Sequence, residues 1–218
     1  MPDSWQRATL SITDVTLDKR PVHYAHPYTG SHSFTYRLFC CLLPCLIMLG
    51  AAPVLASQQN VSLLVDTREL ALSVVQGKQV IQVFDNIAIG SNGATWNKQQ
   101  GDEKTPLGEF RITEVRRSDR FVIFIAIDYP NLDHAQRALD EQRISMETYT
   151  AVKNAFARGR PPPQETRLGG HIGIHGLGSG DPEVHQSFNW TNGCIALTNE
   201  QLAELLPWLA PGTRVVIR

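Results

Sequence analysis

Short alternating strands constrain the fold of this chain more than any other feature of its sequence. Apolar and polar residues alternate over residues 61–66 and 69–75, and extended stretches follow at 79–89, 109–115 and 121–127. Turn residues separate these stretches, and no helical pattern of the length that links parallel strands alternates with them. The sequence therefore predicts a mainly β domain, built as a β-sandwich or a barrel.

A helical segment interrupts the strands in the middle of the chain. Ser145 is a typical N-cap, and the apolar residues from Met146 to Phe156 recur about every 3.6 residues. Gly159 and the prolines at 161–163 end this pattern. We interpret the segment as a helical insertion, which either forms a lid or wall of a substrate site or packs as an appendage.

The last part of the chain predicts a short strand, a helix and a final strand. Residues 171–175 read as the short strand. Thr198 and Gln201 have the spacing of a capping box, and they open a C-terminal helix that extends to about Leu206. A Pro-Gly turn then leads into the final strand at 214–217.

An uncharged run from Leu38 to Ala56 stands near the N-terminus. Arg37 precedes the run, and small residues lie at the positions one and three before a cut after Ala56. We predict a signal peptide at residues 37–56, and hence an exported, periplasmic protein. A membrane anchor is the alternative, because 19 residues are just long enough to span a bilayer. Residues 1–36 are polar, and we expect an unstructured extension there.

The predicted cleavage decides which cysteines remain in the mature chain. Three of the four cysteines, Cys40, Cys41 and Cys45, lie inside the predicted signal peptide. After cleavage only Cys194 remains, so the mature chain cannot form an internal disulfide. Cys194 is then a reactive thiol, one half of an intermolecular bridge, or an inert buried side chain.

Cys194 and His175 have the residue types and surroundings of a nucleophile and its base. A thiol attacks as the thiolate, and a nearby imidazole takes its proton. A glycine stands beside each of them, Gly193 and Gly176, which lets backbone and substrate approach closely. The amides of Cys194, Gly193 and Asn192 are candidates for an oxyanion hole in acyl transfer.

Other roles remain open for these residues on chemistry alone. Cys194 could be a small buried hydrophobe, and His175 could be a core histidine. His171, His175, His185 and Cys194 are also suitable zinc ligands. In one strand, however, His171 and His175 would lie about 13 Å apart, which is too wide for one ion. We therefore expect no metal and no cofactor.

The charge of the chain gives no sign of a nucleic-acid partner. The formal net charge is −1 and the pI is about 6.6, so there is no basic surplus for a phosphate backbone. We expect no nucleic acid among the partners.

Four segments of the sequence stand at the spacing of a known family's motifs. They are Leu64–Thr67 with Leu70–Gly77, Lys104–Phe110, Ile174-His175-Gly176 and Thr191-Asn192-Gly193-Cys194-Ile195. Together they resemble the opening hairpin, the Thr-Pro-x-Gly-x-Phe turn and the paired His and Gly-Cys motifs of the L,D-transpeptidase catalytic-domain family of YkuD type. The resemblance covers residues 61–218 and implies one catalytic domain at 57–218.

The resemblance implies a substrate and a reaction. Cys194 would attack the carbonyl at the L-centre of diaminopimelate in a peptidoglycan stem peptide. D-Ala would leave, with His175 first as base and then as acid, and an amine of a second stem would resolve the acyl-enzyme. Thr191 and Trp190 would help to form the substrate groove, although plain core packing is the favoured interpretation of Trp190.

Two positions depart from the family pattern. Typical members carry His before Gly-Cys, where this chain has Asn192, and Arg or Asn two residues after the cysteine, where it has Ala196. The segment Trp-Thr-x-Gly-Cys-Ile-Ala-Leu is instead similar to murein L,D-transpeptidase-like proteins of YafK type, some of which cleave bonds at diaminopimelate.

These departures leave other functions open. One alternative is a hydrolase that uses the same chemistry to trim stems or to release a murein-linked lipoprotein. A second is a wall-binding module without catalysis. The oligomeric state does not follow from the sequence. A strand-end histidine in a cleft should pack lightly, so we expect His175→Ala to leave folding intact.

Overall fold

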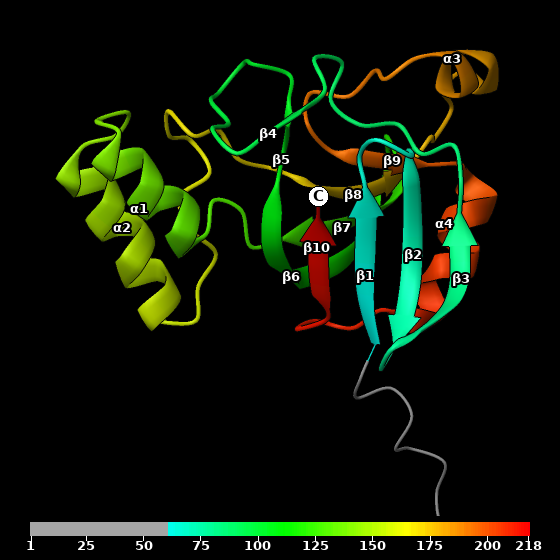
Figure 1. Ribbon diagram of the computed structural model, residues 1–218, viewed down its shortest axis with the longest axis horizontal. Coiled ribbons are helices and arrows are strands. Elements are labelled where there is room, and N and C mark those ends of the chain that lie inside the picture. The colour runs from blue at the N-terminus through cyan, green and yellow to red at the C-terminus, as the bar shows by residue number, and fades with distance from the viewer. Residues whose placement is uncertain (1–60) are drawn as a thin grey trace, which may run out of the picture. The chain divides into compact units, whose positions relative to one another are not determined.

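The computed structural model describes residues 61–218 (Figure 1). The predicted extension at 1–36 and the predicted signal peptide at 37–56, with its cut after Ala56, lie outside the described residues. Within 61–218, none of the helices is long and apolar enough to cross a membrane.

The described residues form one mainly β domain, as the sequence predicts. Eight strands make a sheet in the order β3-β2-β1-β10-β6-β7-β8-β9, and the short strands β4 and β5 pair separately. The strands are β1 Val61–Asp66, β2 Ala71–Gln76, β3 Gln79–Phe84, β4 Ala94–Thr95, β5 Thr105–Pro106, β6 Gly108–Ser118, β7 Val122–Ile127, β8 Gly173–Gly176, β9 Ile195–Leu197 and β10 Arg214–Ile217.

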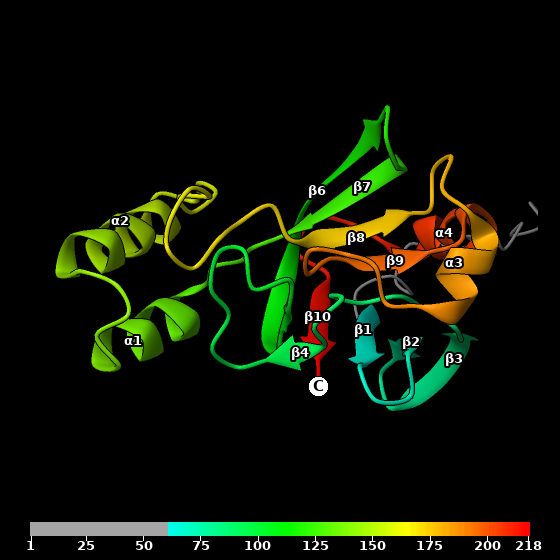
Figure 2. The same cartoon turned by 90° about the horizontal axis from the view of Figure 1, so that it is seen from above.

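The long strand β6 joins two halves of this sheet. Its first residues pair with β10, and from Ile112 onward it pairs with β7. The register between β6 and β7 shifts between Ile112 and Glu114, and such an irregularity bends a strand. Beyond the bend, β7, β8 and β9 run across the direction of β1, β2 and β3 (Figures 1 and 2).

The core is built from both halves of the bent sheet. Alternate residues of β1 and β2 are fully buried, as a strand with one covered face requires. They pack in one cluster with apolar residues of β7, β8 and β9, among them Ile125, Ile174 and Ile195. Helix α4, Asn199–Leu205, adds Leu202 and Leu205, and the short 3₁₀ helix Leu206–Trp208 follows it. The predicted capping box between Thr198 and Gln201 is confirmed.

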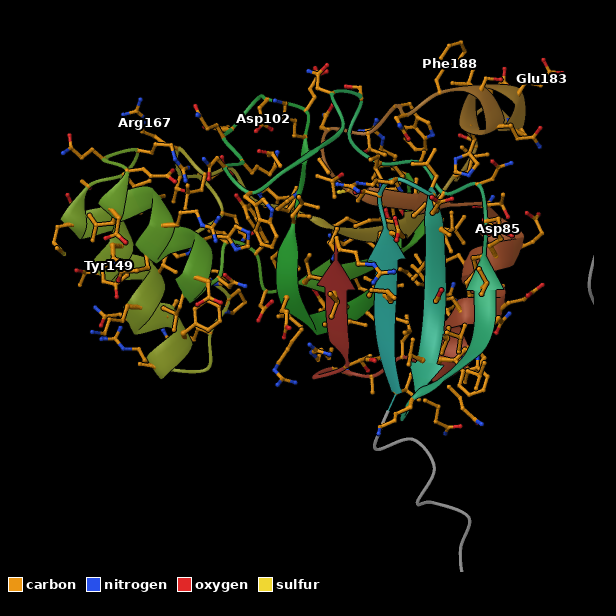
Figure 3. All side chains as sticks on the ribbon, viewed as in Figure 1. Asp85, Asp102, Tyr149, Arg167, Glu183 and Phe188 are labelled. Carbon is orange, nitrogen blue, oxygen red and sulfur yellow. The ribbon has the colours of Figure 1, made fainter. Side chains whose placement is uncertain are left out.

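The helical insertion contains two helices, of which the sequence analysis located one. Helix α2, Met146–Ala157, begins at Ser145, whose side chain accepts from the Thr148 amide as predicted. Helix α1, Leu132–Asp140, was not predicted, and Asn131 caps it. The pair packs together to one side of the sheet (Figure 1). Figure 3 labels Tyr149 on α2.

Several strand boundaries differ from the predicted ones. The third strand ends at Phe84 instead of residue 89, and β6 extends to Ser118. The strand predicted at 171–175 begins only at Gly173, because His171 has a positive φ of 56° and lies before the strand.

A third helix, α3, Pro182–Ser187, was also missed. Asp181 caps it, and Figure 3 labels Glu183 on it and Phe188 just after it.

Candidate active site

Thr191 fixes the loop that carries Cys194. Its backbone exchanges hydrogen bonds with the segment at 89–91: its amide donates to the Ile89 carbonyl at 3.2 Å, and its carbonyl accepts from the Ser91 amide at 2.9 Å. Its hydroxyl donates to the Cys194 carbonyl at 2.7 Å and accepts from the Gly193 amide at 3.1 Å. Thr191 is buried, so these bonds hold the turn before the cysteine in one conformation.

Gly193 occupies a position that no other residue fits. Its φ is +126°, and a Cβ there would lie 2.6 Å from the Lys104 carbonyl oxygen. Its amide already donates to Thr191, so an oxyanion role for this amide would require that bond to be exchanged for one to the substrate.

His175 lies in β8 with one ring nitrogen held by the backbone. Its Nδ1 is 2.8 Å from the Gly176 carbonyl oxygen, which can only accept, so Nδ1 carries the proton. Nε2 is then the basic nitrogen of the neutral ring. Gly176 itself has no room for a side chain, since a Cβ would lie 2.8 Å from the Phe121 carbonyl oxygen and 2.7 Å from Asn199 Oδ1.

Aromatic rings enclose the imidazole of His175. Phe121 stacks on it with ring centroids 3.9 Å apart, and Trp190 meets it edge-on at 5.7 Å. The indole of Trp190 donates to Nδ1 of the buried His185 at 3.2 Å. His175 is only 2% exposed, so the expectation that it packs lightly is wrong. A strand-end side chain is exposed only if nothing covers it, and here the β6–β7 hairpin and Trp190 cover it.

One pocket of about 460 Å³ brings most of the predicted site residues together. It is lined by Cys194, His175, Thr191, Trp190 and Asn192, and by residues of β6, β7 and the segment at 170–172. Gly176 and Gly193 do not line this pocket. No residue of α1 or α2 lines this pocket among residues 61–218, so the structure supports the appendage interpretation of the insertion and not the lid.

Burial sets the charge state of both reacting groups. Loss of water raises the pKa of the Cys194 thiol to about 11, although the Gly173 amide, Lys98 and Arg120 partly oppose this. Burial lowers the pKa of His175 to about 4; the bond to the Gly176 carbonyl opposes the shift, and the charge of Arg120 adds to it. The thiol donates to the His171 carbonyl at 3.4 Å. At neutral pH the resting pair is therefore a thiol and a neutral imidazole.

The comparison with family models decides the family of this chain. The model described as "L,D-transpeptidase catalytic domain" (YkuD) matches residues 60–217.

This chain belongs to the YkuD L,D-transpeptidase catalytic-domain family.

Several solved structures have a similar fold. The helical cell shape determining protein Pgp2 from Campylobacter jejuni is 22% identical, with a TM-score of 0.51 over 73% of this chain and 47% of that chain. Bd1075 from Bdellovibrio bacteriovorus is 20% identical, with a TM-score of 0.47 over 73% and 48%. An Enterococcus faecium L,D-transpeptidase is 13% identical, with a TM-score of 0.43 over 73% and 50%. This chain thus spans about half the length of these structures, and no curated protein matched it.

A buried cation that was not predicted from the sequence lies beside the nucleophile of this L,D-transpeptidase domain. Lys98 is 4% exposed, and its Nζ lies 2.7 Å from Asp102 Oδ1. The carboxylate of Asp102 also accepts from the amides of Gln99 and Lys104, and Figure 3 labels Asp102 in the loop between β4 and β5. The only signal in the sequence was a Lys–Asp pair four residues apart, in a segment that otherwise reads as a polar loop.

The histidines considered for zinc in this L,D-transpeptidase domain have separate environments. His171 is exposed, and its Nε2 lies 2.9 Å from a carboxylate oxygen of Glu165. Nδ1 of His185 accepts a hydrogen bond from the indole of Trp190. His171 and His175 do not share one strand, contrary to the prediction, because His171 lies before β8. Within residues 61–218, no three His, Cys, Asp or Glu side chains gather closely enough to hold a metal ion.

We expect the folded L,D-transpeptidase domain to lose stability as the pH falls from 6.5 to about 4. His175 has an ordinary pKa of 6.5 when unfolded and about 4 when folded, so the unfolded chain binds more protons in this window. That difference is worth about 3 kcal/mol once the pH reaches 4. The pKa values of His134 and His185 are lowered by burial too, which acts in the same direction. Urea unfolding at pH 7 and pH 4.5 measures the loss, and His175→Asn should reduce it; equal losses in both proteins would contradict the assignment.

Proposed function

We propose that this chain is an exported peptidoglycan L,D-transpeptidase with Cys194 as nucleophile and His175 as general base and acid. The observation that carries the proposal is the shared pocket, which is lined by a thiol and by an imidazole whose Nδ1 is fixed by the Gly176 carbonyl. This tautomer leaves Nε2 as the acceptor that thiol attack requires. Membership of the family supports the substrate, a stem peptide that contains diaminopimelate.

In the first half-reaction the thiol is acylated. Nε2 of His175 takes the proton of Cys194 as Sγ attacks the carbonyl carbon at the L-centre of diaminopimelate. The amides of Cys194 and Asn192 stabilise the oxyanion. The C–N bond to D-Ala then breaks, His175 returns the proton to the leaving amine, and a thioester remains.

In the second half-reaction an amine of another stem attacks the thioester. His175 accepts the proton of that amine, the C–S bond breaks, and the proton returns to the sulfur. The product is a new amide between two stems, and the free thiol and neutral imidazole are restored. Water in place of the amine would give hydrolysis with the same residues.

Export is part of the proposal, because the substrate lies outside the cytoplasmic membrane. The run at 37–56 supplies the signal, and its removal would leave a mature chain with Cys194 as its one cysteine. Mass spectrometry of the mature protein from the cell envelope tests this, with residue 57 expected as the N-terminus. A mature protein that retains the run would instead indicate an anchor.

The products of purified mature protein test the reaction. Disaccharide tetrapeptides are incubated with residues 57–218 and with the Cys194→Ala variant, and muropeptides are separated and weighed by mass spectrometry. We expect cross-linked dimers that have lost one D-Ala, absent with Cys194→Ala. Tripeptides and free D-Ala without dimers would show that the protein is a hydrolase and not a transpeptidase. No product at all would count against the tetrapeptide stem as donor.

A further inference from the structure

The β6–β7 hairpin places two arginine–phenylalanine pairs beside His175. The guanidinium of Arg120 lies 4.8 Å from the centre of the Phe121 ring, and that of Arg116 lies 4.9 Å from the centre of the Phe124 ring. Both rings also stack on the His175 imidazole, with centroids 3.9 Å and 6.2 Å away. The two cations are thus each held one ring away from the general base, at the wall of the pocket that contains Cys194.

The charge of this wall is positive and largely uncompensated. Among the described residues that line the pocket, none is Asp or Glu. Arg116 has an acidic neighbour, Glu114, at 3.5 Å. Arg120 forms no ion pair with any other residue in 61–218. Its charge lowers the pKa values of both His175 and Cys194, so its field reaches the two reacting groups.

Neither Lys98 nor position 196 supplies a cation to this pocket. Lys98 is buried against Asp102, and it does not line this pocket. Position 196, where typical family members carry Arg or Asn, is a fully buried alanine whose backbone bonds to Ala88 in both directions. The exposed guanidinium that remains unpaired on the wall is that of Arg120.

The proposed reaction brings a carboxylate to this place. His175 must reach the nitrogen of the leaving residue, because it gives that nitrogen its proton. In a terminal amino acid only the α-carbon separates this nitrogen from the carboxylate. A cation one ring away from His175, on the wall of the same pocket, is therefore placed to meet the carboxylate of a leaving residue that is bound at His175.

We propose that Arg120 binds the free carboxylate of the terminal residue that the donor stem releases, and so selects stems that end at that residue. The inference rests on the proposed function, since it assumes a stem peptide as donor. A guanidinium is well suited to this, because its planar set of N–H donors can form two parallel hydrogen bonds to a carboxylate.

The test compares a tetrapeptide stem that ends in a carboxylate with the same stem ending in a carboxamide. Binding to the Cys194→Ala chain is measured by calorimetry, and turnover by the active chain is measured by release of D-Ala or D-Ala amide. The variants are Arg120→Gln, Arg120→Lys and, as a matched control, Arg117→Gln. Arg117 is exposed on the same hairpin but does not line the pocket.

We expect the unmodified chain to prefer the acid to the amide by about 10- to 100-fold, the range of a charge-assisted hydrogen bond. Arg120→Gln should bring this ratio close to one, Arg120→Lys should restore part of it, and Arg117→Gln should leave it unchanged. A ratio that survives Arg120→Gln, or an equal loss on both stems, would overturn the inference.

Binding and turnover separate this inference from the proposed function. If Arg120→Gln removes the acid preference in binding while the active chain releases no D-Ala, the carboxylate site stands and the transpeptidase proposal fails. If the active chain releases D-Ala but binds acid and amide equally, the transpeptidase proposal stands and the carboxylate site fails. If neither stem binds, both fail.

Discussion

Replacement of Cys194 by alanine is expected to remove acyl transfer while leaving the domain folded. The thiol is the one nucleophile in the proposed reaction, so its loss should lower kcat by about 10⁴-fold or more. The fold should change little, because the side chain is small and the loop is held by Thr191.

Intact mass after incubation with a tetrapeptide stem or a carbapenem measures this effect. The unmodified chain should gain the mass of one acyl group, and Cys194→Ala should gain none. A matched thermal unfolding curve for both proteins controls for folding. An adduct of equal yield on Cys194→Ala would show that Cys194 is not the nucleophile. Absence of an adduct on either protein would favour the wall-binding module that the sequence left open.

Replacement of His175 by asparagine is expected to be the second largest effect. Loss of the general base should lower kcat/KM by about 10²- to 10⁴-fold. Asparagine keeps a donor for the Gly176 carbonyl and leaves a smaller gap between Phe121 and Trp190 than alanine does. We therefore expect His175→Asn to fold, and His175→Ala to lose about 3 kcal/mol of stability in addition to activity.

Steady-state kinetics and urea unfolding separate these two effects. The unmodified chain should lose activity only as the pH falls toward 4, where the imidazole gains its proton and can no longer accept one from the thiol. His175→Asn should have low activity that no longer falls in that acidic window. Full activity of His175→Asn at neutral pH would show that His175 is a core residue without a catalytic role.

Much of the fold follows from local patterns in the sequence. The alternation at 61–66 fixes which face of β1 is buried, because side chains of a strand alternate between two faces. The helix caps at Ser145 and Thr198 are local hydrogen bonds, and a pattern of a few residues is enough to predict them. The loop before Cys194 was predictable for the same reason, since Thr191 and Gly193 act within three residues of it.

The residues that the sequence analysis missed act across long separations in the chain. Arg120 reaches the site because β6 and β7 fold back as a hairpin beside β8, more than fifty positions later in the sequence. Lys98 becomes a buried cation because the loop at 98–104 packs under Gly193. The packing of His175 was misjudged for this reason too, because Phe121 lies far away in the sequence. Helix α1 was missed because its buried residues are two alanines and a histidine, and not the large apolar residues by which a helix face is usually recognised.

The pairing of β8 with β9 has a consequence for how the chain can vary. His175 stands opposite Ala196, two residues after Cys194, and Ala196 is bonded on its other side to the Ala88 backbone at 2.8 and 2.9 Å. The separation of base and nucleophile is therefore set by strand register and not by the connection between the strands. Apart from its last two residues, Asn189, which accepts from the Ile89 amide, and Trp190, which covers His175, that connection can lengthen, shorten or change its helix α3 over evolutionary time. Substrate preference can diverge there while the reacting pair keeps its alignment.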